Sequence, residues 1–438
     1  MRAVALLIAG VLAACGGGER TAPYTPAPRP PSPALATAIP AGSTAWSNAS
    51  LARVFTRLTH DLEWGASRPG LVRYESPVRV EMTGRGSAGY QAFLAGYLTL
   101  LRDRAGVDIA PAPQDGNLAI RFVSGSDFNQ ILPGNSCVLA PGAVAWDDFR
   151  DDPDRLGGKR LENDDTLTET TIFVPRNAAP ARIRSCLIEE VAQALGPAND
   201  LYGLGPTIFN DDGAHRWPTA LDLLMIETLY QPELRTGLSR ARTEAAVRRA
   251  LDQLNPTGVA TPPIRFDNPP ALSAWRKSQK QVFAGTPDAL AKARRAQALA
   301  ARVAPGSAFE CHSLRMLGQI ETRQTPGQAL ATLRRAAALC AAVHGPGDIR
   351  LALIGLDRAI ALYRQGSYTD AAAELARHEA SLAAHGHEER LGALYHLRAK
   401  AYLAKGQRPE AAEARRLAEA WTAYAFGQDS DLLDRIRN

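Results

Sequence analysis

The sequence predicts a mixed α/β domain followed by an all-helical domain, and three observations support this fold class. Segments with strand-like and helical patterns alternate up to about residue 258, whereas the later segments are rich in Ala, Leu and Arg and have helical periodicity. Five prolines lie in residues 256–270, which is typical of a domain boundary. A composition of 45% hydrophobic and 22% charged residues excludes a wholly disordered chain.

The first domain is predicted to contain three strands and three long helices. Residues 78–82 alternate as a strand does, residues 118–123 form an apolar strand, and residues 170–174 form a third that ends at Pro175. Apolar residues three and four positions apart predict helices at residues 90–104, 181–195 and 220–230. Residues 147–165 are rich in Asp, Arg and Gly, which predicts a surface loop.

Residues 1–14 predict a lipoprotein signal peptide. Arg2 precedes twelve small and apolar residues, too few to span a bilayer but of the length of a secretory signal core. The stretch ends in Leu12-Ala13-Ala14-Cys15, which resembles the lipobox of bacterial lipoproteins. The resemblance implies that Cys15 becomes the first mature residue and anchors the protein to a membrane through diacylglycerol and palmitate-type acyl chains. A signal peptide cleaved elsewhere is the alternative.

Residues 15–45 are then a lipidated, Pro-rich tether. Seven prolines within residues 21–42 favour extended polyproline II, which would span up to roughly 80 Å at about 3.1 Å per residue. Residue 16 is Gly and not Asp, so the lipoprotein sorting pattern implies the outer membrane, facing the periplasm. The predicted folded domains are residues 46–258 and 271–438, joined by a Pro-rich linker at residues 259–270.

The helical domain contains an internal repeat. Residues 365–371 recur forty residues later as residues 405–411, and each copy predicts a helix, a Gly-centred turn and a second helix. This resembles tetratricopeptide repeats, which place a small Ala where the two helices meet, although the usual period is 34 residues. His378 stands where that family has Ala; consensus positions are held by Tyr402, Ala411 and Ala418. An unrelated helical bundle is the alternative.

The helix at residues 181–195 carries a pattern related to zinc peptidases, H-E-x-x-H-x-x-G-x-x-H/D. Glu190 occupies the position of the catalytic Glu, and Gly196 that of the Gly that ends the helix. Residues i and i+4 share a helix face and can grip one ion, with the intervening Glu turned towards the bound water. At the three metal-ligand positions this chain has Glu189, Gln193, and Asn199 or Asp200.

At these residues the chain resembles a bacterial family of unknown function, number 2927, which is distantly similar to the zincins. The resemblance covers roughly residues 71–238 and depends on residues 186–200, 208–212, 222–230 and 232–234. It implies that the strand before the motif helix is an edge strand and that residues 222–230 form the C-terminal helix of a metzincin-like fold. The expected fold is therefore an α+β zincin-like domain followed by an all-α tetratricopeptide-like helical repeat domain.

The residues at the ligand positions make a zinc site unfavourable, and no metal or other cofactor is expected. Catalytic zinc has three ligands from His, Cys and carboxylates, and the two His of this domain, His60 and His215, are not at ligand spacing. The favoured interpretation is a hydrogen-bonded remnant of a cleft, in which Gln193 donates an amide N–H to a neighbouring carboxylate. A calcium-like cation on oxygen ligands is the alternative, with candidates Glu189, Glu190, Asp200 and Asp211. Further cleft candidates are Asp211, Asp212, His215 and Asp222.

The cysteines predict two disulfides. With Cys15 lipidated, four cysteines remain, and export would place them in an oxidising compartment. Four cysteines allow three pairings, and the simplest keeps each bond within one domain: Cys137 with Cys186, and Cys311 with Cys340. Four buried free thiols are the alternative.

The remaining charged residues do not indicate a nucleic-acid partner, because a net charge of +5 is mild for 438 residues. Three Arg pairs on predicted helices are expected either as solvated edges or as the lining of a groove for an acidic partner: Arg294-Arg295, Arg334-Arg335 and Arg415-Arg416. Three His near a predicted turn are expected to face solvent: His378, His385 and His387.

The leading functional hypothesis is an envelope lipoprotein that binds a protein or peptide without catalysis, through the repeat face, the remnant cleft, or both. The first alternative is a divergent zinc metallopeptidase that uses Glu190 as the general base. The second is a structural envelope scaffold. Two motifs of other hydrolases and nucleotide-binding proteins, G-x-S-x-G and the P-loop, are absent from the sequence.

Overall fold

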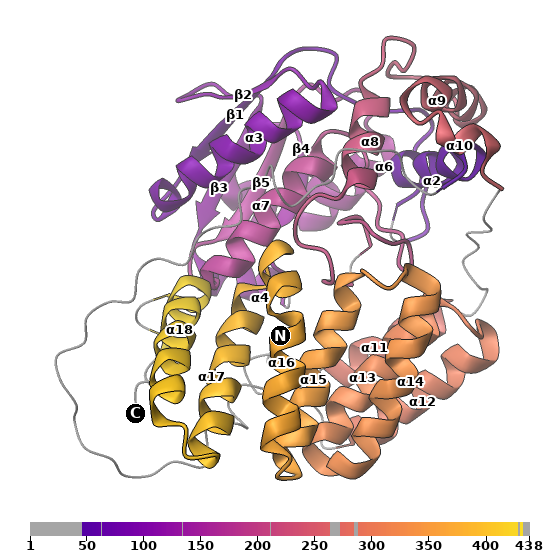
Figure 1. Ribbon diagram of the computed structural model, residues 1–438. Helices are drawn as coiled ribbons and strands as arrows, with labels where there is room; N and C mark the ends of the chain where they lie inside the picture. The colour runs from indigo at the N-terminus through magenta and orange to yellow at the C-terminus, as the bar shows by residue number, and fades with distance from the viewer. Residues whose placement is uncertain are drawn as a thin grey trace. The chain divides into compact units, whose positions relative to one another are not determined.

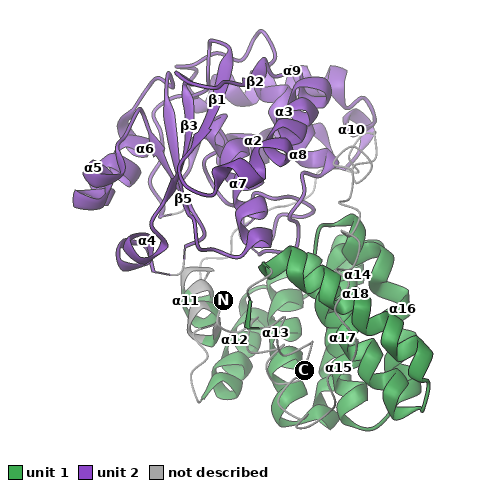
Figure 2. Cartoon of the chain, turned by 90° about the vertical axis from the view of Figure 1, so that its left-hand side faces the viewer, with its two compact units in different colours: residues 1–33, 267–438 green, residues 34–266 purple. Residues whose placement is uncertain are grey.

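The computed structural model describes residues 46–62, 64–133, 135–210, 212–262, 272–283, 288–427 and 430–431. The predicted signal peptide, Cys15, the tether, Asp211 and most of the predicted linker lie outside these residues. The chain divides between residues 266 and 267 into two compact units, drawn in purple and green in Figure 2. The purple unit contains the sheet and is called the sheet unit; the green one is entirely helical over its described residues and is called the helical unit.

The sheet unit is built on five strands in the order β2-β1-β3-β5-β4 (Figure 1). Every described pair is parallel except β4–β5, which is antiparallel and places β4 at the edge. All three predicted strands are confirmed, whereas the short strands β2 and β4 were not predicted. The strands are β1 (Val78–Thr83), β2 (Ile109–Pro111), β3 (Leu118–Val123), β4 (Val138–Pro141) and β5 (Thr170–Pro175).

The prediction that the strand before the motif helix lies at the sheet edge is wrong. That strand is β5, which pairs with β3 on one side and with β4 on the other, so that Ile172 lies opposite both Ile120 and Leu139. All six residues of β5 are buried. A continuous run of apolar and β-branched residues is typical of such an interior strand, because both of its faces are covered.

The predicted helices are confirmed to within one residue at each end as α3 (Gln91–Ala105), α7 (Pro180–Ala194) and α8 (Ala220–Leu229). Their apolar faces share one core with the sheet, in which Leu98, Leu187 and Ile226 are fully buried. The Tyr97 hydroxyl donates a hydrogen bond to the Ile188 carbonyl at 3.0 Å and thereby joins α3 to α7. These contacts fix the position of α7, the motif helix, against the sheet.

The prediction of a surface loop at residues 147–165 is wrong, because most of this segment is helical. It contains α5 (Trp146–Asp151), a π-helical turn (Asp154–Gly158) and α6 (Lys159–Asn163). Its charges pair within the segment at helical spacing, as in Arg150–Asp147 at 2.8 Å and Arg160–Asp164 at 3.0 Å, and such pairs stabilise helices. With α4 (Gly125–Ile131), the segment packs on β5 through an aromatic cluster: Phe128, Trp146, Phe149 and Phe173.

Two further helices, α2 (Asn48–His60) and α9 (Arg240–Leu254), lie near the two ends of the sheet unit's sequence and pack against each other. They run antiparallel, because the start of α2 bonds to the end of α9 and the end of α2 bonds to the start of α9. Asn48 Nδ2 donates to Asp252 Oδ1 at 2.8 Å, and Asn255 Nδ2 donates to Asn48 Oδ1 at 2.9 Å. At the other end, Asp61 pairs with Arg240. A short helix, α10 (Thr257–Ala260), follows.

The helical unit confirms the prediction of an all-helical second region over its described residues. Consecutive helices are joined by short connections, and each packs against the next. The helices are α11 (Leu272–Phe283), α12 (Ala289–Val303), α13 (Ala308–Gln324), α14 (Pro326–His344), α15 (Ile349–Arg364), α16 (Tyr368–Ala384), α17 (Glu388–Ala404) and α18 (Arg408–Phe426).

Three glycines spaced twenty residues apart end α15, α16 and α17 in the same way. Gly366, Gly386 and Gly406 have positive φ values of 80°, 69° and 74°, which favour glycine. After each, the next N–H reaches back five residues: Ser367 to Leu362, His387 to Leu382 and Gln407 to Tyr402, at 2.9 to 3.0 Å. This is the Schellman ending of a helix. The forty-residue period of the sequence therefore corresponds to two helix–turn units of twenty residues.

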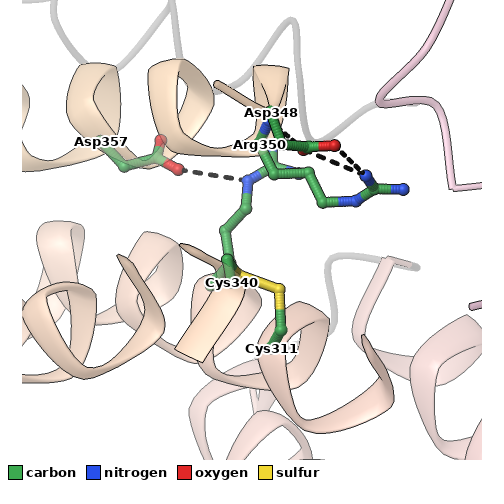
Figure 3. Close-up of a disulfide and its surroundings, with 6 residues drawn as sticks. Cys311, Cys340, Asp348, Arg350 and Asp357 are labelled. Atoms are coloured by element: carbon green, nitrogen blue, oxygen red, sulfur yellow. Dashed lines mark hydrogen bonds and ion pairs between the residues drawn. A yellow bond between two sulfur atoms is a disulfide. The ribbon is translucent and has the colours of Figure 1, made fainter. Parts of the chain in front are cut away.

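Both predicted disulfides are present. Cys137, directly before β4, is bonded to Cys186 of α7, and Cys311 of α13 is bonded to Cys340 of α14. Figure 3 shows Cys311–Cys340 beneath the start of α15, where Arg350 Nη1 lies 2.9 Å from Asp348 Oδ2. Asp357 of α15, also labelled there, forms an ion pair with Arg315 Nε of α13, 3.8 Å away. Each bond therefore joins two secondary-structure elements within one unit.

The prediction that His378 and His387 face solvent is wrong. His387 is buried, and His378 of α16 packs against Gly355 of α15, where an added Cβ would lie 2.0 Å from the His378 Nε2 atom. The bulky His at a position where the tetratricopeptide pattern has Ala is thus accommodated by a missing side chain on the facing helix. The same arrangement places Gly318 against Leu333 and Gly392 against Thr422.

We expect Gly355→Ala to lower the free energy of unfolding by about 1–3 kcal/mol, because the added methyl group overpacks the α15–α16 contact. Adding His378→Ala removes the clashing ring, so the double variant should be more stable than Gly355→Ala alone. Urea unfolding followed by circular dichroism measures both. The control is Gly327→Ala, where an added Cβ meets no atom within 4 Å. Equal stability of the single and double variants would show that the ring is not the cause.

Candidate functional site

The motif residues lie along α7, which is attached to β4 by the disulfide at Cys186. Glu189, Glu190 and Gln193 are each half-buried. Gly196 follows the end of the helix and has a φ of 144°. A Cβ added at Gly196 would lie 2.8 Å from the Val72 carbonyl oxygen. The Gly of the motif is therefore required by both the backbone conformation and a close approach of the chain.

The predicted hydrogen bond from Gln193 to a carboxylate is present. Gln193 Nε2 donates to Asp200 Oδ1 at 3.3 Å, across the turn that follows α7. Asp200 is buried, with 6% of its surface exposed, so its carboxylate depends on partners from the protein. A metal ion held at these two positions would need a lone pair from each residue. The Gln193 amide group instead directs an N–H proton at Asp200.

Asn199 does not join this pair. Its Nδ2 donates to the carbonyl oxygen of Arg57 in the last turn of α2, at 2.9 Å, and the residue is 4% exposed. Asn199 therefore anchors the turn after α7 to α2. Of the two residues considered for the third ligand position, Asp200 is the one that the structure brings to Gln193.

Arg182 lies near both Glu189 and Arg216, and sequence reasoning missed the two arginines. Burial lowers the pKa of Arg182 to about 10; the positive charge of Arg216 acts in the same direction, and the negative charge of Glu189 opposes it. The first ligand position therefore has a guanidinium group of the protein itself nearby. Arg182 lies seven residues before Glu189 on the same helix, at a spacing that could have indicated their proximity.

Asp222, predicted to line the cleft, is instead a fully buried residue that caps α8. Its carboxylate accepts hydrogen bonds from the Thr219 N–H at 2.7 Å, from the Ile208 N–H at 3.2 Å and from the Thr207 hydroxyl. Burial raises its pKa, while those hydrogen bonds and the nearby His215 oppose the shift. The Thr219-x-x-Asp222 spacing is a capping-box signature that the sequence already contained.

Two of the other predicted cleft residues, Asp212 and His215, lie in one turn of the chain, and His60 lies elsewhere. Asp212 Oδ1 accepts from the Ala214 N–H at 2.8 Å within a turn, and His215 is buried beside it. His60 lies on α2, where its Nε2 is 3.1 Å from Thr243 Oγ1 of α9, and burial together with Arg240 lowers its pKa to about 4. Among the described residues, no group of three His, Cys, Asp or Glu side chains is arranged to hold a metal ion.

A small cavity beside Gln193 is lined in part by a buried arginine, Arg68. Arg68 Nε donates to the Leu161 carbonyl of α6 at 2.9 Å, and its Nη1 donates to the Gly196 carbonyl at 3.2 Å. Burial lowers the pKa of Arg68 to about 10, and the charge of Asp164 opposes this shift. The cavity, about 20 Å³, has room for water and none for a side chain.

A second, polar cavity of about 330 Å³ adjoins the first, and the two share Pro141, Arg160, Asp164 and Thr166. It opens beside the end of β4, where the Arg160 guanidinium covers Gly142. Its lining also includes Asp165 and Glu169. Gln193 lines only the smaller cavity, so the larger one opens away from the motif residues.

Comparison with known families assigns one domain of the chain. Residues 48–249 match a family described as Protein of unknown function (DUF2927), followed by the helical region. The match extends from α2 to α9, two helices that pack together, and is wider than the resemblance at residues 71–238. No curated protein and no solved structure matches the chain. Among the described residues, no helix is both long and apolar enough to span a membrane.

Proposed function

We propose that this chain, whose residues 48–249 form a DUF2927 domain, is a non-enzymatic module that binds a protein or peptide. One observation carries the proposal: the amide N–H of Gln193 is donated to Asp200 at 3.3 Å, at two positions where a zinc peptidase would have metal ligands. The motif thus keeps the layout of a peptidase helix while its polar groups satisfy one another.

The charges around the motif support the same function. A zinc ion is held by lone pairs of His, Cys or carboxylate groups. Here Gln193 offers a neutral amide, Asn199 is bonded to α2, and Arg182 brings positive charge to Glu189. The carboxylates of the site are therefore balanced by hydrogen-bond donors and guanidinium groups of the chain itself.

The finer fold assignments belong to this proposal. A zincin-like origin of the sheet unit is supported by the antiparallel edge strand β4, by Glu190 on α7 and by Gly196, whose positive φ follows the end of that helix. A tetratricopeptide-like origin of the helical unit is supported by the repeated helix–turn units and by the close contacts at Gly318, Gly355 and Gly392. Helical arrays of this kind commonly bind peptides and proteins.

The proposed location is the outer membrane, facing the periplasm, with a lipid anchor on Cys15. The lipobox at residues 12–15 supports the anchor. The two disulfides support an oxidising compartment, because such bonds persist in exported proteins. No cofactor and no nucleic acid are part of the proposal.

One alternative retains a specific observation in its favour. Glu190 keeps the position of the general base, is half-buried and lies one helical turn and a half before Gly196. A divergent metallopeptidase would use this carboxylate to take a proton from a water molecule.

A single experiment separates the two functions. The soluble form that begins after Gly42 is incubated with zinc, dialysed, analysed for bound metal and assayed against a library of unstructured peptides. We expect less than stoichiometric zinc and no cleavage that depends on Glu190. The variants are Glu190→Gln and, as a control, Glu227→Gln on α8, another half-buried glutamate.

Stoichiometric zinc together with cleavage that is lost only in Glu190→Gln would overturn the proposal in favour of the peptidase. Without cleavage, the proposal requires a partner. Cross-linking in the envelope, followed by binding of the two purified proteins, tests this requirement. Failure of every cross-linked candidate to bind the purified chain would count against a binding module.

A further inference from the structure

Positive charge is concentrated in one part of the helical unit. Residues 272–344 contain eleven Lys and Arg against three Asp and Glu, a net charge of +8, whereas the whole chain carries +5. Neither α12 nor α14 contains an acidic residue, although both carry pairs of arginines. The mild charge of the chain therefore conceals a strongly basic region.

α12 and α14 present these arginines in the same way. Each helix buries small or apolar residues on one face, such as Ala293 and Ala296 on α12, and Leu333 and Ala336 on α14. The pairs Arg294-Arg295 and Arg334-Arg335 follow directly after Ala293 and Leu333 and are exposed. With 100° of rotation per residue, they project from the faces opposite the buried ones.

Within the part of the chain that the structure describes, most of these arginines have no acidic partner. Among the described residues, Arg295, Arg334 and Arg335 form no ion pair with a carboxylate, and Arg294 donates to the neutral Gln328 Oε1 of α14 at 3.2 Å. The outer arginines of α16 and α18 are different. Arg377 pairs with Glu374 at 2.8 Å, and Arg416 pairs with Glu413 at 2.6 Å.

The hydrogen bond between Arg294 and Gln328 also shows that the two helices lie within reach of each other. Arg334 follows Gln328 by six residues, about 9 Å along the helix axis. The arginine ridge, defined as Arg294, Arg295, Arg334 and Arg335, therefore spans a distance that a segment of a few residues can cover.

We propose that the arginine ridge binds an acidic segment of a partner protein, through the carboxylates of its Asp and Glu residues. Guanidinium groups suit this ligand because two coplanar N–H donors of one group can bind the two oxygens of one carboxylate. This inference rests on the proposed function and deepens it by giving the chemistry of the partner and the helices that receive it.

The ridge fits a protein better than a membrane or a nucleic acid. Insertion into a lipid surface and stacking on bases use exposed aromatic or large apolar side chains beside the charges. Among the described residues, α12 exposes none, and α14 exposes only Val343 in its last turn, 36% of whose surface is accessible. Charge alone is presented here, and an acidic protein segment is complementary to it.

The test measures binding of a fluorescein-labelled, Glu-rich peptide of about 12 residues to the soluble form, by fluorescence anisotropy, with the matching Gln-rich peptide as a control. The ridge variant is Arg294→Ala, Arg295→Ala, Arg334→Ala and Arg335→Ala together. The control variant is Arg377→Ala, Arg415→Ala and Arg416→Ala, whose side chains pair with glutamates. We expect about tenfold weaker binding for the ridge variant, less than about twofold for the control, and weaker binding of the wild type as NaCl rises from about 50 to about 300 mM.

All these side chains are exposed, and an unchanged circular dichroism spectrum verifies that the variants fold. Equal losses in both variants, or no binding of the wild type at low salt, would refute the ridge. Tighter binding to vesicles with anionic phosphatidylglycerol, or to a single-stranded oligonucleotide, would overturn the choice of a protein partner.

The two proposals fail in different ways. If a partner found by cross-linking binds the ridge variant as tightly as the wild type, the ridge is refuted while the binding function stands. If the acidic peptide binds through the ridge but the chain cleaves peptides with Glu190, the proposed function fails and the ridge stands.

Discussion

Replacing Cys137 and Cys186 together with serine should lower the free energy of unfolding of the sheet unit by about 4 kcal/mol. The bond closes a loop with a sequence separation of 49, and without it the unfolded chain gains about that much conformational entropy. The bond also fixes the start of β4 to α7, so its loss releases the edge strand from the motif helix. Urea unfolding followed by near-ultraviolet circular dichroism measures the change.

A matched control for this experiment is Cys311→Ser with Cys340→Ser. That bond has a sequence separation of 29 and lies in the helical unit, where its loss should cost about 3.5 kcal/mol. The two double variants should therefore destabilise different transitions. If the reduced wild type and the Cys137→Ser, Cys186→Ser variant are as stable as the oxidised wild type, the cross-link does not constrain the unfolded chain as the entropy argument requires.

The second large effect is expected for Asp222→Ala, which should cost about 3 kcal/mol. Removing the carboxylate leaves the N–H groups of Ile208 and Thr219 and the hydroxyl of Thr207 without their acceptor inside the core. The segment that they hold leads into α8, so both the cap and the approach to the helix are lost. Thermal or urea unfolding of the variant gives the change in stability.

Asp212→Ala serves as the control for this prediction. Asp212 also accepts a backbone N–H, from Ala214 at 2.8 Å, but it is only half-buried and caps no helix. Its replacement should cost no more than about 1 kcal/mol. Similar losses for Asp212→Ala and Asp222→Ala would mean that the cap and the burial of Asp222 contribute little to stability.

The fold could be predicted for those segments whose own sequence pattern indicates a helix or a strand. β1, β3 and β5 and helices α3, α7 and α8 are long enough for their periodicity to be read from neighbouring residues alone. β2 and β4, with three and four residues, are too short to show a pattern. Residues 147–165 were misread because their composition is that of a loop, whereas the spacing of Arg150 to Asp147 and of Arg160 to Asp164 is that of a helix.

In the candidate site, only contacts between residues close in sequence could be predicted. Gln193 and Asp200 meet across a single turn, so their hydrogen bond could be expected from the sequence. The hydrogen bond from Asn199 to Arg57, a residue 142 positions away, could not be predicted in this way, because it depends on where α2 packs. Arg68 reaches the end of α7 for the same reason. The disulfides are the exception, because four cysteines in two domains leave few choices and so reveal distant contacts.

The antiparallel pairing of α2 with α9 determines how the sheet unit responds to a mechanical load. The chain enters the unit beside Asn48 and leaves it beside Asn255, and these two residues are hydrogen-bonded to each other. A force applied between the two ends therefore acts at one end of the helix pair and separates it one contact at a time, from Asn48–Asn255 towards Asp61–Arg240. The α2–α9 pair therefore bears this load before the sheet does.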